Sequence, residues 1–136
     1  MHLRIRLGTE HYALDLDHVL EVVELGEVTP VPGSAATLIG IRNLRGELLP
    51  VLDLSASLGV AGESASCSLV VVADDDRRAG LAVDEVIDLS QLPEATARVD
   101  SLLVQGGVLV DGALVGVVDV SAVLGSSPGS SGTELG

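Results

Sequence analysis

The most obvious candidate metal ligands in the chain are its three histidines, His2, His11 and His18. Imidazole nitrogens are common ligands of zinc and other transition metals. Apolar and polar residues alternate over 2–7 and 11–16, which predicts a hairpin that places His2 and His11 apart. The single cysteine, Cys67, adds no convincing further ligand. We therefore expect no metal site.

Patterns that could support catalysis are equally weak. GSSPG at residues 125–129 matches the G-x-S-x-G of hydrolase nucleophiles, but it lies in a low-complexity tail rather than at a strand-to-helix turn. The acidic run 74–76 lacks the glycine and terminal glutamate of a calcium loop. The chain has no lysine for a Walker motif and no G-x-G-x-x-G loop to bind phosphate. We expect no catalytic residues and no cofactor.

The composition limits the class of partner. The chain of 136 residues has a formal net charge of −13, seven arginines and one aromatic residue, Tyr12. Such a surface repels nucleic acid and anionic membranes, so a basic partner or a mostly apolar interface fits better. A ligand-binding β-barrel is a less favoured alternative, because small-molecule pockets usually have aromatic walls. One cysteine, no signal peptide and no membrane span indicate a cytoplasmic protein.

Short strands and turns are predicted along most of the chain. Residues 2–7 and 11–16 form strands around a turn at 8–10, and the spacing of valines predicts a helical turn near 17–22. Asp15 or Asp17 would cap that turn. Further strands are expected on both sides of RNLRG, at 68–73, at 80–89 and in a hairpin around Asp111-Gly112.

Residues 46–59 contain two signals about local structure. Pro50 lies inside an apolar run, so this strand is expected at a sheet edge or with a bulge, because proline cannot donate a ladder hydrogen bond. Asp53 can cap a short helix that ends at Gly59.

A repeat organises the chain. GELLPVLDLSASLG at 46–59 returns as GALVGVVDVSAVLG at 112–125, with eight of fourteen letters identical, and 14–22 resembles 81–89. Two pairs at nearly one offset indicate two halves of one design, although chance recurrence in a low-diversity sequence is the alternative. Each half has about five short strands, which closure into a small barrel would stabilise. The expected fold class is all-β, with two small five-stranded barrels sharing one core and short helical turns.

The phrase IGIRNLRGELLPVLDLSASLG resembles the signature of CheW-like domains, as do EHYALDLDHVLEVVE, GLAVDEVIDL and LVGVVDVSAVLG in family order. The resemblance implies two interlocked SH3-like barrels within a domain at 1–125. The first barrel is expected at roughly 15–65 and the second at roughly 68–115, with the terminal strands crossing over. The tail at 126–136 is expected to be disordered.

The resemblance also implies a function. CheW-like adaptors have no catalytic activity and couple the cytoplasmic tips of methyl-accepting chemoreceptors to the regulatory domain of a CheA-type histidine kinase, in arrays under the membrane. Residues 90–104 look abbreviated beside the family, which favours an alternative, an accessory adaptor that binds the receptor or another CheW-like protein without the kinase. No nucleic acid and no direct membrane insertion are expected.

The resemblance assigns partner-binding roles to Val19, Glu21 and Arg45. For Val19 and Glu21 the alternative is a core valine beside a solvated glutamate. For Arg45 it is a structural role, in which the guanidinium bonds loop carbonyls or a nearby carboxylate. A second set of motif residues is expected to shape the structure: Asn43, Gly46, Pro50 and Asp53.

Overall fold

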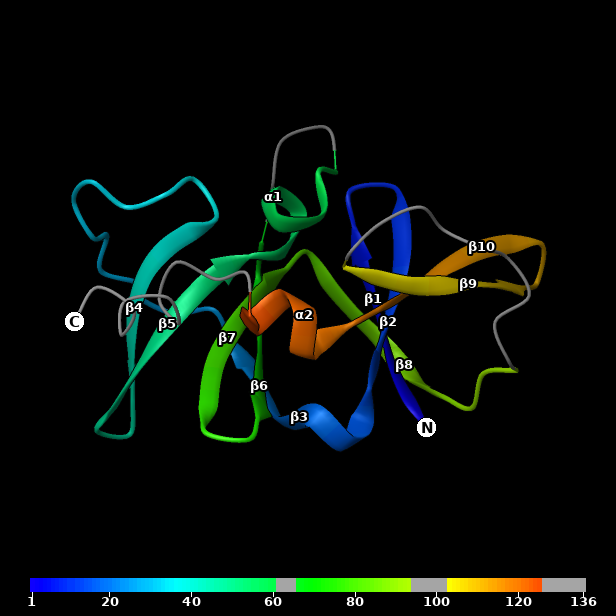
Figure 1. Ribbon diagram of the computed structural model, residues 1–136, viewed down its shortest axis with the longest axis horizontal. Helices are drawn as coiled ribbons and strands as arrows, with labels where there is room; N and C mark the ends of the chain where they lie inside the picture. Colours follow the sequence, from blue (N-terminus) through cyan, green and yellow to red (C-terminus); the bar gives the residue numbers. More distant parts are fainter. Residues whose placement is uncertain (61–65, 94–102, 126–136) are drawn as a thin grey trace.

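The computed structural model describes residues 1–60, 66–93 and 103–125, and its strands form two five-stranded sheets (Figure 1). Sheet A has the order β8-β1-β2-β10-β9 and contains β1 (His2–Leu7), β2 (Glu10–Asp15), β8 (Glu85–Ser90), β9 (Val104–Val110) and β10 (Ala113–Val118). Sheet B has the order β3-β6-β7-β5-β4 and contains β3 (Val19–Glu24), β4 (Leu38–Leu44), β5 (Glu47–Asp53), β6 (Ser68–Asp74) and β7 (Arg77–Val83).

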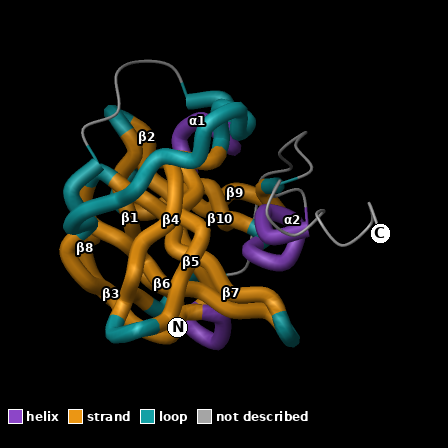
Figure 2. Tube along the Cα trace, turned by 90° about the vertical axis from the view of Figure 1, so that its left-hand side faces the viewer, coloured by secondary structure: helices purple, strands orange, loops and turns teal. Residues whose placement is uncertain are grey.

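Three short helices complete the described structure: η1 (Leu16–His18), α1 (Leu54–Leu58) and α2 (Val120–Gly125). Figure 2 shows α1 and α2 on the outside of the strands. None of the described helices is long and apolar enough to cross a membrane.

The two halves of the chain exchange strands. Sheet A joins β1 and β2 of the first half to β8, β9 and β10 of the second, while sheet B joins β6 and β7 to β3, β4 and β5. The all-β fold with two interlocked five-stranded sheets is confirmed. The sheets divide the chain differently from the expected ranges, because residues 68–83 pair within sheet B rather than in the second barrel.

The chain crosses between the sheets at two points. The first crossing follows β2 at η1, and the second follows β7 at Asp84. Asp84 is buried, and its Oδ2 accepts a hydrogen bond of 2.8 Å from the backbone N–H of Gly8. This bond ties the second crossing to the turn between β1 and β2.

The sequence repeat is a structural repeat. In sheet B, β5 runs parallel to β7 with Leu52 opposite Leu81, and in sheet A, β10 runs parallel to β2 with Val118 opposite Leu14. The hairpins before β5 and β10 turn at Arg45-Gly46 (φ 51° and 88°) and at Asp111-Gly112 (φ 49° and 82°). Two central residues with positive φ define the type I′ hairpin turn.

Each half then ends in a capped helix. Asp53 Oδ1 accepts a hydrogen bond of 3.3 Å from the Ala56 N–H at the start of α1. Asp119 Oδ1 accepts one of 3.1 Å from the Ala122 N–H at the start of α2. Matching turns, registers and caps exclude chance recurrence of similar letters.

The main core is aliphatic and belongs to both sheets. Its buried residues include Ile5 and Leu14 of sheet A and Leu52, Val70 and Leu81 of sheet B. A second, smaller cluster inside sheet B contains Leu49, Leu69 and Val71, among others. Alternate residues of β6 therefore enter different clusters, which explains why the whole strand is apolar.

Two local expectations need correction. The helical turn is shorter than expected: η1 ends at His18, capped by Asp15 Oδ1, which accepts from the Asp17 N–H at 2.9 Å. Residues 19–24 are strand β3, because they form a backbone ladder with β6, and their burial alternates with period two. The spacing of the valines predicted a helical turn here, and for residues 19–24 that prediction was wrong.

Pro50 lies in an interior strand rather than at an edge. In the hairpin of β4 with β5, the pair Leu44–Glu47 closes a two-residue turn, and hydrogen-bonded pairs then alternate with non-bonded pairs. Pro50 opposite Ile41 falls on a non-bonded pair. Pairing of β5 with β7 begins only at Val51, so the missing N–H of Pro50 interrupts neither ladder. The expectations for residues 94–102 and for the tail at 126–136 lie outside the described residues.

Candidate partner-binding site

Two predicted site residues, Arg45 and Glu21, form an ion pair. Arg45 lies in the turn between β4 and β5, and its Nη2 donates to Glu21 Oε2 on β3. The Arg45 side chain is 65% exposed and that of Glu21 is 32% exposed. Because β3 and β4 are the two outer strands of sheet B, this pair joins its opposite edges and curls the sheet toward a barrel.

Arg42 strengthens the same closure and was missed as a site residue. Its Nη1 donates to the carbonyl oxygens of Glu24 at 2.6 Å and Leu25 at 2.9 Å. Beyond them, Thr29 and Ile41 exchange two backbone hydrogen bonds of 2.8 Å. The signal for Arg42 was its place in the IRNLR string, as a charged residue inside an apolar strand.

The turn that presents Arg45 is held by its own neighbours. Asn43 Oδ1 accepts a hydrogen bond of 2.9 Å from the Gly46 N–H. Gly46 has φ 88°, which glycine adopts without the steric cost that a side chain brings. Asn43 and Gly46 thus fix the direction from which the Arg45 side chain leaves the turn.

Val19 is placed differently from Glu21. It is half-buried and packs against the main core, which agrees with the core interpretation of this residue. Its neighbours Leu20 and Val22 are the exposed apolar residues of β3, at 50% and 41% exposure. Sequence reasoning missed both, because the helical spacing assigned to this segment hid the period-two alternation of the strand.

Most of the described arginines are held by carboxylates on this acidic protein. Besides the pair of Arg45, the ion pairs of the described residues are Arg4–Asp88 at 3.9 Å, Arg6–Glu85 at 3.0 Å, Arg6–Asp84 at 4.0 Å, Arg77–Asp74 at 2.7 Å and Arg78–Glu47 at 3.0 Å. The hydrogen bond from Arg77, helped by one from Ser121, lowers the pKa of Asp74 below its ordinary value. The remaining acidic surface favours partners that bring positive charge.

The three histidines are dispersed in the structure. His2 lies opposite Asp15 and His11 opposite Arg6 in the register of β1 with β2. His18 Nδ1 lies 3.1 Å from the carbonyl oxygen of Ala73. Within the residues that the structure describes, no group of three or more His, Cys, Asp or Glu side chains could hold a metal ion.

Two five-stranded sheets that exchange strands between the halves of the chain define a β protein of the SH3-like type. Residues 2–128 match the model of the CheW-like domain, and the chain belongs to that family.

Similar proteins span most of this chain. It is 28% identical over 129 residues to the chemotaxis protein CheW of Thermotoga maritima, which covers 90% of this chain and 85% of that protein. It is 34% identical over 118 residues to the protein FrzA of Myxococcus xanthus, covering 85% and 72%. The crystal structure of the scaffolding protein TtCheW from Thermoanaerobacter tengcongensis superposes with a TM-score of 0.70, at 30% identity, over 87% of each chain.

Proposed function

We propose that this chain couples the cytoplasmic tips of chemoreceptors to the regulatory domain of a CheA-type histidine kinase. As a member of the CheW-like family it is a chemotaxis adaptor, and no catalytic step is assigned to it. The observation that carries the proposal is the family match over residues 2–128 on the same two-barrel architecture. Coupling requires two contacts whose free energies depend on each other, so that the receptor biases the kinase through the adaptor.

Glu21 and Arg45 are proposed to contact the receptor tip, with Val19 holding the start of β3 in place. Their ion pair supports this assignment, because residues far apart in the sequence meet at the surface where the two edges of sheet B come together. The exposed Leu20 and Val22 supply apolar contact area beside the charges. An apolar patch around a charged group is a common way to bind a helical tip.

The proposed place of action is the cytoplasm, beneath membrane receptor arrays or in cytoplasmic receptor clusters. The accessory adaptor, which binds a receptor or another CheW-like protein but no kinase, is the second candidate function. The ground for it is the resemblance of the sequence to the family, beside which residues 90–104 look abbreviated.

Calorimetric titration tests both candidates. The full chain is titrated with the receptor's cytoplasmic tip and separately with the regulatory domain of the cognate kinase. Binding to both partners supports the coupling adaptor, whereas binding to the tip alone supports the accessory adaptor. Binding to neither would overturn the proposed function while leaving the family assignment intact.

A further inference from the structure

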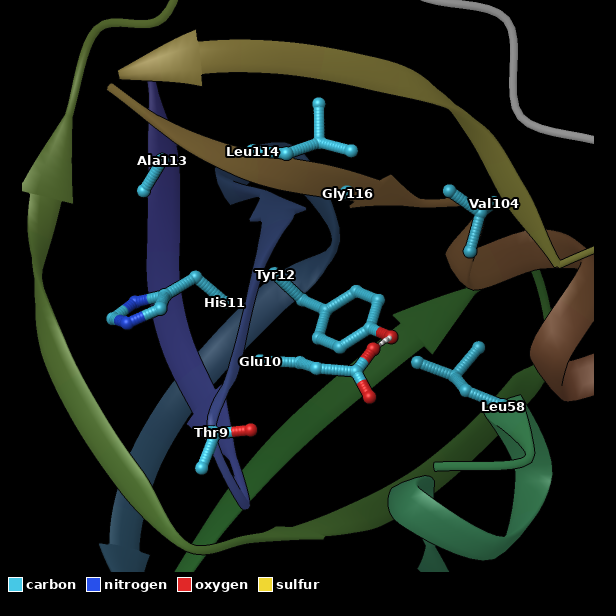
Figure 3. A pocket seen from close by; sticks show the side chains of 9 residues that line it. All are labelled: Thr9, Glu10, His11, Tyr12, Leu58, Val104, Ala113, Leu114 and Gly116. Carbon is cyan, nitrogen blue, oxygen red and sulfur yellow. Dashed lines mark hydrogen bonds between the residues drawn. The ribbon is translucent and has the colours of Figure 1, made fainter. Parts of the chain in front are cut away.

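A pocket of about 450 Å³ opens between the β1–β2 turn, α1 and the hairpin of β9 with β10. Its apolar lining includes Leu58, Val104 and Leu114, and its polar lining is Thr9, Glu10, His11 and Tyr12 (Figure 3). In Figure 1 the β1–β2 turn lies at the top, whereas the β4–β5 turn that carries Arg45 lies at the lower left. The pocket is therefore separate from the proposed partner-binding site.

Tyr12 and Glu10 form the polar wall as a unit. The Tyr12 hydroxyl donates a hydrogen bond of 2.7 Å to Glu10 Oε1, and both side chains point toward Leu58 (Figure 3). Burial, followed by the hydrogen bond and the charge of Glu10, raises the pKa of Tyr12 well above its ordinary value. The hydroxyl therefore keeps its proton and holds the carboxylate in the pocket.

The space in the pocket depends on Gly116. A Cβ atom at this position would lie 2.9 Å from Tyr12 Cδ1 and 3.0 Å from Cε1. Gly116 also lies directly opposite Tyr12 in the parallel pairing of β10 with β2. The tyrosine ring can therefore lie flat beside the strand, and the volume beyond it stays open.

The equivalent place in the other half carries its own positive charges. There the repeat puts Pro50 where the pocket has Gly116, Arg77 where it has Glu10, and Ala79 where it has Tyr12. Arg77 pairs with Asp74, and the neighbouring Arg78 pairs with Glu47. The combination of Gly116, Tyr12 and Glu10 is thus specific to one half, and the other half has a positive charge at the position of Glu10.

Within the described part of the chain, no cationic side chain lies within ion-pair distance of Glu10. The described arginines are already held by carboxylates or, for Arg42, by carbonyl oxygens. A carboxylate on one wall and aliphatic side chains on the other match a ligand with a cationic end and an apolar stem. The pocket volume lies in the range of small-molecule sites.

We propose that this pocket binds a small organic cation with an apolar stem, of the alkylguanidine or alkylamine class. The charged end pairs with Glu10, and the stem packs between Leu58, Val104 and Leu114. This site is independent of the adaptor role, so the failure of either proposal leaves the other untouched.

The test uses n-butylguanidinium as the probe and n-butylurea as its uncharged analogue. Tyr12 is the only aromatic residue of the chain, so its fluorescence reports on the pocket wall alone. We expect a saturable change with the cation, with a dissociation constant in roughly the millimolar range for a ligand of this size. Amide chemical shifts of Ala113 and Gly116 should move along the same curve. The urea should bind about tenfold more weakly or not at all.

Matched variants distinguish binding of the cation in the pocket from its general attraction to the acidic surface of the protein. Glu10→Gln should weaken binding of the cation about tenfold, whereas Glu27→Gln removes the same charge from an exposed loop and should leave it unchanged. Ala113→Ile, at an exposed strand position that lines the pocket, should block the stem without disturbing the core. Equal binding of cation and urea, equal losses in the two glutamine variants, or no saturation overturns the proposal.

Discussion

Arg45 and Glu21 join the two outer strands of sheet B, although 24 positions separate them in the sequence. The pair works with two other contacts of β4, the Arg42 bonds to Glu24 and Leu25 at the end of β3 and the backbone bridge of Ile41 with Thr29 in the loop after β3. The proposed receptor contact therefore lies on the seam that closes the barrel. A partner that competes for Arg45 or Glu21 would act on this seam directly.

Arg45→Ala and Glu21→Lys should each weaken binding of the receptor tip about tenfold. The free energy of unfolding should fall by no more than about 1 kcal/mol, because exposed ion pairs stabilise proteins only weakly. Calorimetry gives the binding change, and urea unfolding gives the stability change. Exposed Glu27→Lys on the following loop is the charge-matched control for Glu21→Lys. Parental binding by both variants would show that these residues do not form the contact.

Asp74→Asn should make stability less dependent on pH. Bonds from Arg77 and Ser121 lower the pKa of Asp74 in the folded protein, so its charged form stabilises the fold. This stabilisation is present above the ordinary carboxyl pKa and is lost as the pH falls through the lower folded-state pKa. Urea unfolding should therefore show a deficit for Asp74→Asn at pH 7 that shrinks below about pH 4. The exposed neighbour Asp76→Asn is the control, and a deficit independent of pH would contradict the mechanism.

Tyr12 should lose its proton at a higher pH in the folded protein than in the unfolded chain. Burial and Glu10 raise its pKa, so tyrosinate absorbance should appear well above pH 10 in the native state and near pH 10 in urea. Because the unfolded chain loses the proton first, the free energy of unfolding should decline as the pH rises above about 10. Tyr12→Phe should remove this decline. Glu10→Gln should move the titration only part of the way, since burial is the largest cause.

Gly40→Ala should disrupt the backbone bridge between Thr29 and Ile41. A Cβ atom on Gly40 would lie 2.1 Å from the carbonyl oxygen of Thr29, which accepts the hydrogen bond of Ile41. The bridge cannot form without movement, so the free energy of unfolding should fall by about 2–4 kcal/mol. Gly33→Ala is the control, because a Cβ atom on Gly33 would have no heavy atom within 4 Å. Only the φ of 76° opposes this change, and it should lower the free energy of unfolding by roughly 1 kcal/mol. Equal losses in the two variants would refute a steric cause.

Much of the fold follows from local sequence signals. The repeat of 46–59 at 112–125 indicated two matched halves, and the cap at Asp53 lies where the spacing predicts, with Asp119 as its counterpart in the second copy. The exchange of strands between the halves is not a local property, because β1 and β6 have the alternation of any strand. It was expected only through the family resemblance.

The site was less predictable, for physical reasons. Residues 19–24 fit both a helical face and a strand, and only the ladder with β6 decides between them. The contact of Arg45 with Glu21 depends on how far sheet B curls, which no short segment encodes. The pocket exists because Gly116 has no side chain beside the Tyr12 ring. A sequence motif is recognised by the side chains it contains, so it does not indicate such a space.

The strand exchange also has an evolutionary consequence. Each sheet takes two strands from one half of the chain and three from the other, in equivalent order. Two copies of a single half, each lending its first two strands to the other, would build the same pair of sheets as a swapped homodimer. Gene duplication and fusion of such a half would turn that dimer into one chain, and the two matching hairpins and capped helices would be what remains of its twofold axis.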